Sequence, residues 1–341
     1  MGREKRDLYY KGLHSQAHEK LTSMLAFGDS RAEDKRTGAD RQKIYSFATY
    51  RTYRRAIMRF VKYVEQYHPN CTSLKKARKY ANEWLESRVE AGMSAWTVSM
   101  EASAISKLYN IPADSSERFH SPQRRREDIK RSRGDAKRDK HFSVRNNDEL
   151  IKFVCATGTR RGVLQKLRGD DLWSRERAEI KIAELRGKGK LTDAEARLLR
   201  ILQEALSTFP EFDFYLMHRQ DKGGRYRVAP ILSEHQDLVV RRMQAAAPNE
   251  LVFRHVHAAA DIHHFRGVYC QSLYRKYARL PEDIPYDKVH GGTGKLYQSD
   301  LYICRSDEKG RKLDRAAMEK VTIAMGHSRI DVIARNYLYG L

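Results

Sequence analysis

One basic stretch restricts the fold of this chain more than any other feature. Residues 124–140 contain nine Lys or Arg and four Asp or Glu in 17 positions, with almost no apolar side chains. A segment with so little apolar surface cannot contribute to a hydrophobic core, so we expect it to be solvated. It divides the chain into two parts, and 341 residues with 40% hydrophobic content are enough for two separate cores.

We expect four segments on this basis. In chain order they are an N-terminal extension, a helical domain, a basic interdomain linker and a second domain, over residues 1–41, 42–112, 113–145 and 146–341. In the helical domain, apolar residues recur every three or four positions from residue 46 to about 64, at 73–91 and at 94–109. This period predicts amphipathic helices, and Pro112 ends the series.

The first predicted helix carries a strongly basic face. Between its apolar positions lie four arginines, Arg51, Arg54, Arg55 and Arg59. Positive charge concentrated on one face is typical of phosphate contacts, although a merely solvated face is the plainer alternative. We interpret these residues, together with Arg124, Arg125 and Arg126 of the linker, as phosphate contacts.

The second domain has a mixed pattern. Strand-like runs lie at 179–182, 212–218 and 226–232, and a Gly-Gly turn joins the last two. Helical periods follow Asn147 and Gly162 and recur at 191–206, 234–246, 261–279, 313–325 and 329–339. The expected fold class is therefore mainly α with a small antiparallel β-sheet, in which a helical domain precedes an α+β domain.

Charge and cysteine content narrow the class of partner and the compartment. The net charge is +22, and residues 1–145 hold 32 basic against 18 acidic groups, which points to a polyanion. No apolar run reaches 18 residues, and the N-terminus lacks the apolar region of a secretory signal. The four cysteines are scattered singly, so we expect reduced thiols in a cytoplasmic protein.

Two common kinds of site are not supported. Residues 291–296 resemble a phosphate loop, but Val289 replaces its first glycine and Leu296 replaces the hydroxyl residue after the lysine. The 13 histidines form no HExxH motif, and the cysteines lack the spacing of a zinc site. We therefore expect neither a nucleotide nor a metal cofactor.

Four short segments of the second domain each place a cation or a histidine in a tight local setting. In chain order they are Thr157–Gly162, Asp221–Arg227, His263–Arg266 and Met325–Ser328, and the last is followed by Tyr337 and Tyr339. Each segment taken alone is weak evidence, because Arg-Gly turns and single histidines are common structural features.

Together and in this order, the segments resemble the active site of the tyrosine recombinases, the lambda-integrase-like family. The resemblance covers residues 146–341 through motifs, and residues 42–112 are similar to the family's helical core-binding domain by pattern only. It implies a site-specific recombinase or integrase that exchanges DNA strands through a covalent 3′-phosphotyrosyl intermediate. It also implies duplex DNA with specific recombination sites as the partner, and self-assembly as a dimer to tetramer on that DNA.

The resemblance assigns six catalytic residues. Arg160 matches the first family arginine, Lys222 the lysine on the turn between two strands, His263 and Arg266 the His-x-x-Arg motif, His327 the Gly-His motif, and Tyr337 the nucleophile ten residues later. Two positions depart from the family pattern. Val163 stands where an acidic residue is common, and Gly267 where a larger residue is common.

The chemistry of strand cleavage requires residues of these types. A phosphodiester is anionic, so attack requires cations such as Arg160 and Arg266, whose guanidiniums match phosphate oxygens. A phenol has an unperturbed pKa of about 10, and nearby positive charge favours its phenolate. Covalent catalysis by Tyr337 then conserves the bond as an ester, and Lys222 is the candidate acid for the departing 5′ hydroxyl.

Several alternatives stay open from the sequence. Tyr339 is a second candidate nucleophile, Lys188 and Lys190 compete with Lys222, and Arg161 competes with Arg160. A type IB topoisomerase-like enzyme that relaxes DNA as a monomer would use the same chemistry. A non-catalytic DNA-binding protein of the same fold is a third possibility.

Overall fold

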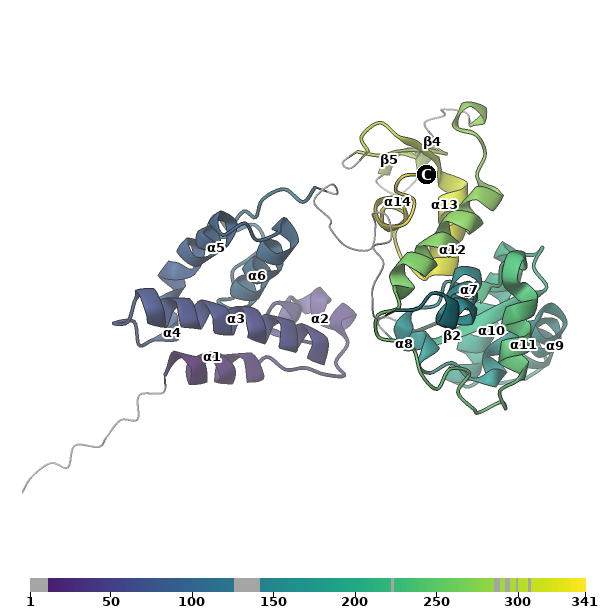
Figure 1. Ribbon diagram of the computed structural model, residues 1–341, viewed down its shortest axis with the longest axis horizontal. Coiled ribbons are helices and arrows are strands. Elements are labelled where there is room, and N and C mark those ends of the chain that lie inside the picture. Colours follow the sequence, from purple (N-terminus) through teal and green to yellow (C-terminus); the bar gives the residue numbers. More distant parts are fainter. Residues whose placement is uncertain are drawn as a thin grey trace, which may run out of the picture. The chain divides into compact units, whose positions relative to one another are not determined.

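The computed structural model describes residues 12–125, 142–221, 224–284, 289–291, 295–298, 300–305 and 308–341 (Figure 1). The chain divides into two compact units, residues 1–128 and 129–341, which we describe separately as the first and second units. Among the described residues, no helix has the length and apolar character needed to cross a membrane.

The first unit is helical. Its helices are α1 (Leu13–Thr22), α2 (Arg31–Thr37), α3 (Phe47–Tyr67), α4 (Leu74–Ala77), α5 (Ala81–Glu90) and α6 (Ala95–Leu108), with short 3-10 turns at Ala39–Gln42 and Arg78–Tyr80. The starts of α3 and α6 follow from their caps, because the hydroxyls of Ser46 and Ser94 accept hydrogen bonds from the third backbone N–H of each helix.

The core of the first unit extends beyond the helical domain expected from the sequence. Leu13, Ala17 and Leu21 of α1 are buried in the same cluster as Ile57 and Phe60 of α3. The spacing of four residues in α1 places these side chains on one face of the helix, toward α3. The described part of residues 1–41 is therefore packed into this unit, which begins before residue 42.

In its described residues, the second unit combines helices with three small antiparallel sheets. Its helices are α7 (Asp148–Thr157), α8 (Arg161–Leu164), α9 (Arg175–Arg186), α10 (Asp193–Thr208), α11 (Gln236–Gln244), α12 (Ile262–Tyr277), α13 (Arg315–Met325) and α14 (Asp331–Asn336). Its strands are β1 (Leu172–Ser174), β2 (Phe214–Asp221), β3 (Arg225–Pro230), β4 (Val289–Gly291), β5 (Lys295–Gln298), β6 (Leu301–Ile303) and β7 (Lys312–Asp314).

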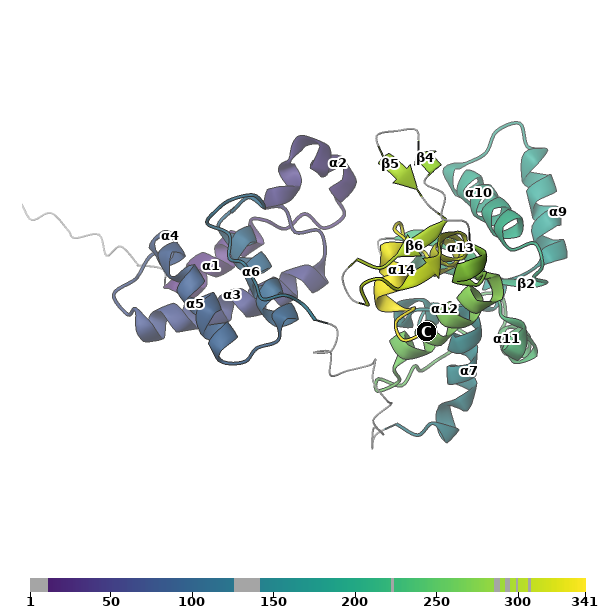
Figure 2. The same cartoon turned by 90° about the horizontal axis from the view of Figure 1, so that it is seen from above.

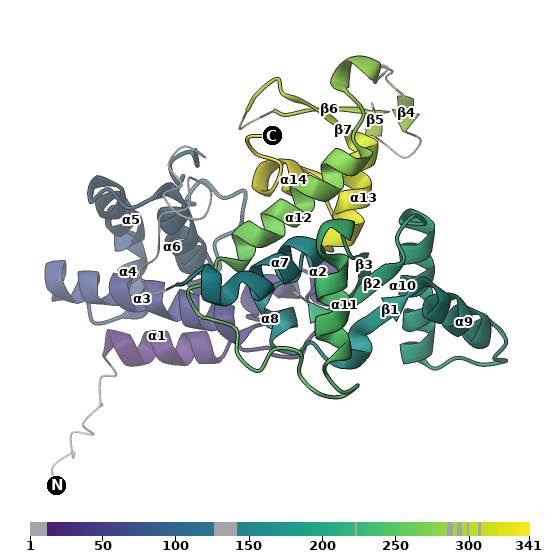
Figure 3. The same cartoon turned by 45° about the vertical axis from the view of Figure 1, so that its right-hand side comes forward.

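The sheet order and the packing of α12 build the framework of the second unit. Strands β1, β2 and β3 form one sheet in that order, and β4–β5 and β6–β7 are separate pairs. Helix α12 packs against both α7 and α13, which Figures 2 and 3 show from two sides. The mainly α fold with small antiparallel sheets is thereby confirmed.

One predicted strand is wrong. Residues 179–182 lie inside α9, and the strand of this region is β1, which ends at Ser174. The Ser174 hydroxyl accepts a hydrogen bond from the N–H of Arg177 and starts the helix. Ala178, Ile182 and Leu185 are then buried at spacings of four and three, a helical period that a four-residue window cannot reveal.

Candidate active site

The turn that carries Arg160 is fixed by a glycine. Helix α7 ends at Gly158, whose φ of 59° lies in the left-handed region. A Cβ at this position would lie 2.4 Å from the ring of Tyr269 on α12, so the turn packs directly against that helix. Arg160 follows as the residue that precedes α8.

His263 and Arg266 belong to the first turn of α12. The Asp261 carboxylate caps this helix by accepting a hydrogen bond from the N–H of His264, at 3.0 Å. Residues three apart share a face of a helix, so His263 and Arg266 point the same way. Both line one pocket, whereas His264 does not.

A second glycine positions His327. Helix α13 ends at Gly326, with a φ of 64°. A Cβ here would lie 2.7 Å from both Cδ and Nε of Arg227, so a side chain would displace that buried arginine. The conformation and the close approach both require glycine, and His327 follows at the edge of the pocket.

Tyr337 follows the last residue of α14, and other elements of the second unit hold its backbone. The side chain of Gln271 on α12 donates a hydrogen bond to the carbonyl of Tyr337, at 2.9 Å. Arg311 donates to the carbonyl of Leu338, at 2.6 Å. The Tyr337 side chain is 5% exposed and lines the pocket, whereas Tyr339 is 37% exposed and does not.

Five of the six predicted catalytic residues line one pocket of about 550 Å³, namely Arg160, His263, Arg266, His327 and Tyr337. The ring of Tyr337 lies 5.4 Å from that of His263 and 5.6 Å from that of His327, between centroids. The guanidinium carbon of Arg266 lies 5.9 Å from the same ring. A phenol, two imidazoles and the two guanidiniums predicted for catalysis thus share one cavity.

The charges of this pocket have well-defined supports. Arg160 forms an ion pair with the carboxylate of Asp221, and its other terminal nitrogen donates to the carbonyl of Met325 at 3.4 Å. Arg266 is 1% exposed and donates to the carbonyls of Gly158 and Met325. Burial, followed by repulsion from Arg160, lowers the pKa of Arg266 below its ordinary value.

His327 is held neutral at pH 7. Burial, followed by the positive charges of Arg266 and Arg160, lowers its pKa to about 4. A neutral imidazole can donate one hydrogen bond without bringing a further charge to the site.

Two buried nitrogen atoms of pocket-lining residues have no hydrogen-bond partner among the described residues. They are Nε of Arg266 and Nε2 of His327. Buried polar atoms are normally paired, so donors of this kind suit a ligand rich in acceptor oxygens. The pocket can therefore bind an anion through cationic and neutral donors together.

The alternative candidates for the catalytic arginine and lysine either lie outside the pocket or have their donors bonded to other groups. Arg161 touches the pocket, but its guanidinium donates to four backbone carbonyls, those of Val256, His257, Ala258 and Ala260. Lys188 is paired with Glu195, at 2.6 Å, and neither Lys188 nor Lys190 lines the pocket. Lys222 and Arg126 lie outside the described residues.

Comparison with known proteins concerns mainly the first unit. Residues 40–112 match the family model for the phage integrase N-terminal SAM-like domain. This part of the chain is therefore similar to the SAM-like domain of phage integrases. The resemblance to integrase-type recombinases is thereby confirmed for the first unit. No curated protein matches the sequence.

Solved structures with a similar arrangement are recombinases of low sequence identity. One is XerH site-specific recombinase bound to palindromic difH substrate in a post-cleavage complex, with 15% identity, a TM-score of 0.45, and coverage of 96% of this chain and 91% of that chain. The pre-cleavage complex of XerH has 14% identity and a TM-score of 0.43, with coverage of 96% of this chain and 92% of that chain. XerA recombinase has 14% identity and a TM-score of 0.24, with coverage of 93% of this chain and 92% of that chain.

The arginines that were predicted as phosphate contacts in the first unit differ in their partners. Arg51, Arg54 and Arg55 are exposed on α3 and have no ion-pair partner among the described residues. Arg59 is paired with Glu101 of α6, at 3.1 Å, and this carboxylate is fully buried and also holds Arg88. Arg59 therefore links α3 to α6, and three of the four predicted phosphate contacts remain available. In the segment after the domain, Arg124 donates to the hydroxyl of Ser99.

Sequence reasoning missed the residues that do not line the pocket but hold its lining residues in place. Asp221 contacts both Arg160 and Arg227, and His218 accepts from Arg227 at 2.7 Å. Asp221 stands directly before Lys222 in the predicted motif. Its contacts with the two arginines depend on the direction of its side chain at the end of β2, which the motif does not reveal. Gln271, which holds the backbone of Tyr337, carried no signal in the sequence.

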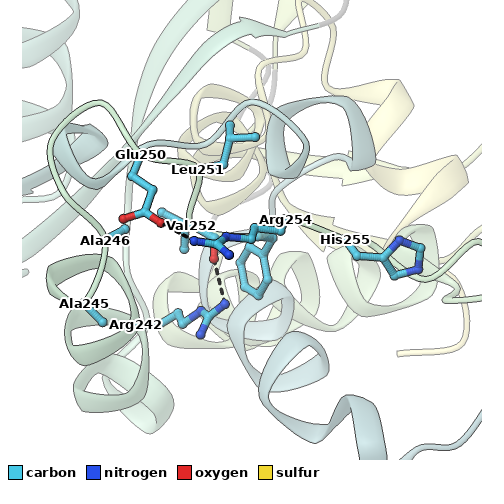
Figure 4. Close-up of a pocket in the computed structure, with 9 residues that line it drawn as sticks. Arg242, Ala245, Ala246, Glu250, Leu251, Val252, Arg254 and His255 are labelled. Carbon is cyan, nitrogen blue, oxygen red and sulfur yellow. Dashed lines mark hydrogen bonds and ion pairs between the residues drawn. The ribbon is translucent and has the colours of Figure 1, made fainter.

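A second pocket, of about 380 Å³, has a different character (Figure 4). Arg242 donates there to the carbonyl of Val252, and Arg254 donates to the carboxylate of Glu250. None of the five predicted catalytic residues that the structure describes lines it. In the part of the chain that the structure describes, no group of three or more His, Cys, Asp or Glu is arranged to hold a metal ion.

Proposed function

We propose that the chain is a site-specific DNA recombinase or integrase that cleaves and rejoins strands through a covalent bond between Tyr337 and a 3′ phosphate. One observation carries the proposal. Five residues from four separate segments, chosen from the sequence for this chemistry, line a single pocket. The SAM-like domain of the first unit supports it independently.

The arginines provide the charge that the reaction needs. Attack on a phosphodiester builds negative charge on the non-bridging oxygens, and Arg160 and Arg266 face the pocket in which that phosphate would bind. The neutral imidazole of His327 adds a hydrogen-bond donor when its proton is on Nε2. Each preorganised contact of this kind typically contributes about 2.7–4 kcal/mol to lowering the barrier.

The covalent step is an in-line displacement. A bond forms between Oη of Tyr337 and phosphorus while the bond from phosphorus to the 5′ oxygen breaks. The phenol proton passes to a base, for which His263 is the nearby candidate at 5.4 Å between ring centroids. The departing 5′ oxygen takes a proton, and by resemblance Lys222 supplies it. The scheme uses only side chains of the chain itself.

The substrate is duplex DNA in this proposal, and the first unit binds its backbone. Arg51, Arg54 and Arg55 form an exposed stripe on α3 of the SAM-like domain. Such contacts fix the position of a protein on DNA without reading its sequence. Strand exchange further requires that several chains assemble on one DNA site.

Trapping the covalent intermediate tests the proposal. Duplexes selected from a random library by affinity for the protein would carry a nick at successive positions, so that the short released fragment cannot rejoin. We expect a protein–DNA adduct that survives denaturation with wild type and with Tyr339→Phe, but not with Tyr337→Phe.

Three other outcomes would redirect the assignment. An adduct that Tyr339→Phe abolishes and Tyr337→Phe leaves intact would move the nucleophile to Tyr339. Relaxation of supercoiled plasmids that lack the selected site would favour a topoisomerase. Failure of wild type to form an adduct on tightly bound duplexes would leave a non-catalytic DNA-binding protein.

A further inference from the structure

A break in the regularity of β2 sets the direction of Asp221. In the ladder with β3, His218 pairs with Arg227 and Asp221 pairs with Arg225, so two residues on β2 oppose one on β3. This is a β-bulge, and Gln220 within it has a φ of 46°, which a residue other than glycine rarely adopts.

The bulge brings two polar side chains to the same side of the strand. Residues three apart on a regular strand face opposite sides, because side chains alternate. The extra residue cancels that alternation, and His218 and Asp221 are both buried and both contact Arg227. Strained backbone beside a functional pocket commonly serves to aim a side chain. Here the aimed side chain is Asp221.

Asp221 sits at the centre of a cluster of cations. Its carboxylate is 3% exposed, forms an ion pair with Arg160 and accepts from Nε of Arg227 at 3.3 Å. Arg227 donates further to His218 and to the carbonyl of Ala324. Asp221 is the one carboxylate that Arg160 contacts in the described part of the chain. Val163, which stands where the family often has an acid, cannot provide this support.

The carboxylate holds Arg160 from the side away from the pocket. Arg160 lines the pocket, but Asp221 does not. The contacts to Asp221 and Met325 use two of the five N–H groups of the guanidinium. The guanidinium carries three further N–H groups, and the Arg160 side chain lines the pocket. Asp221 therefore neither blocks the pocket nor competes directly for the face that a ligand would use.

We propose that Asp221 is a positioning residue, which fixes the plane of the Arg160 guanidinium so that its free donors face the scissile phosphate. The inference deepens the proposed strand-transfer function and rests on it for the catalytic consequence. The ordering of Arg160 itself does not depend on that function and is measured separately.

The first experiment measures the mobility of Arg160 without DNA. In protein labelled with ¹⁵N-arginine, the Nε–H signal of Arg160 is assigned by its loss in Arg160→Lys, and its order parameter is obtained from relaxation. We expect a rigid group in wild type and an order parameter below about 0.6 in Asp221→Asn. The matched control is Asp171→Asn, which removes another buried carboxylate, paired with Arg219 away from the pocket. An Arg160 signal that stays rigid in Asp221→Asn would overturn the proposal.

The second experiment measures adduct formation on the nicked duplex. We expect Asp221→Asn to slow it by about 10- to 100-fold, which is at or below the loss of about 100- to 1000-fold that follows complete removal of one preorganised donor. Affinity for the duplex should stay within about 3-fold of wild type, and Asp171→Asn should keep the wild-type rate. If Arg160 loosens while the adduct forms at the wild-type rate, Asp221 has no positioning role in catalysis. If wild type forms no adduct, the proposed function fails, and the relaxation data still decide what holds Arg160.

A second variant covers the case in which Asp221→Asn does not fold. Removing this carboxylate leaves Arg227 buried beside two other arginines, which is destabilising. The double variant Asp221→Asn/Arg227→Gln removes one charge of each sign. It should show the same mobile Arg160 and the same slower adduct, and a rigid Arg160 in it would contradict the inference equally.

Discussion

At the scale of single residues, the part of the second unit that the structure describes buries two arginines, Arg227 and Arg266, which are 6% and 1% exposed. A buried guanidinium is tolerated only when acceptors satisfy its N–H groups. Arg266 uses the carbonyls of Gly158 and Met325, which are neutral. Neutral acceptors satisfy hydrogen bonds but do not cancel charge. The site therefore keeps a positive charge that an anionic ligand can neutralise.

The same charges predict how His327 affects stability with pH. Its pKa is about 4 in the folded protein, against 6.5 for the unperturbed residue. Above pH 7 the ring is neutral in both states and contributes no pH dependence. As the pH falls from 6.5 to about 4, the unfolded chain binds a proton that the folded site excludes, so stability declines. Below about pH 4 the ring is protonated in both states, so His327 causes no further decline in stability.

Urea unfolding of wild type and His327→Gln between pH 4.5 and 7.5 tests this. Trp84 and Trp96 belong to the first unit and Trp173 to the second, so a Trp84→Phe/Trp96→Phe background lets Trp173 report the second unit alone. The stability of wild type relative to the variant should be constant near pH 7 and fall toward pH 4.5. A difference that does not change over this range would show that the pKa of His327 is not depressed.

At the scale of elements, two turns carry site residues because their glycines let side chains of neighbouring elements come close. The turn after α7 is the clearer case, since Gly158 combines a positive φ with contact to Tyr269. Gly162, in α8, has an ordinary backbone, and a Cβ there would meet no heavy atom within 4 Å. The two glycines are four residues apart, and only Gly158 lies where the backbone and the neighbouring side chain leave no room for a Cβ.

We therefore expect opposite effects from the same substitution. Gly158→Ala should destabilise the second unit by about 2–4 kcal/mol, from the left-handed backbone and the overlap with Tyr269. Gly162→Ala should be neutral or stabilise it by up to about 1 kcal/mol, because alanine favours helix. Unfolding of both variants, followed through Trp173, checks the pair. Equal effects at the two positions would contradict this account of the turn.

How much of the fold could be predicted from the sequence depends on the length of each helix or strand. Long helices such as α3 and α12 were predicted close to their observed bounds, because many periodic positions define them. The run at 179–182 was too short to distinguish a strand from one turn of α9. The pocket residues were identified by local motifs. The support from Asp221 could not be predicted, because it depends on a bulge and on an ion pair across 61 positions of the chain.

At the scale of the whole molecule, the positive charge falls into two classes. The arginines of the pocket are few and largely buried, whereas Arg51, Arg54 and Arg55 are exposed. Exposed cations that bind DNA release counterions, so their contribution depends on salt. The basic linker, expected at 113–145 from the sequence, belongs to the second class in this interpretation.

Neutralising Arg124, Arg125 and Arg126 to glutamine should therefore weaken binding to all duplexes. The slope of log affinity against log salt should become shallower by about one for each phosphate that the variant no longer binds. A variant with Lys181, Lys188 and Lys190 changed to glutamine loses the same number of charges near the end of α9, where Lys181 and Lys188 are already paired with glutamates. It should keep the wild-type slope. Equal slopes in wild type and the linker variant would exclude phosphate binding by these arginines.

In the proposed reaction, the hydrogen bonds that hold the C-terminal segment would determine which chain supplies the nucleophile. Gln271 and Arg311 hold the carbonyls of residues 337 and 338, and Tyr337 lies in the pocket of its own chain. A chain that keeps this arrangement on DNA attacks only the phosphate bound by its own arginines. Equimolar Arg160→Ala and Tyr337→Phe should then fail to complement each other, because neither chain has both the clamp and the phenol. Recovery of the adduct in the mixture would mean that the segment leaves its pocket and serves a neighbouring chain.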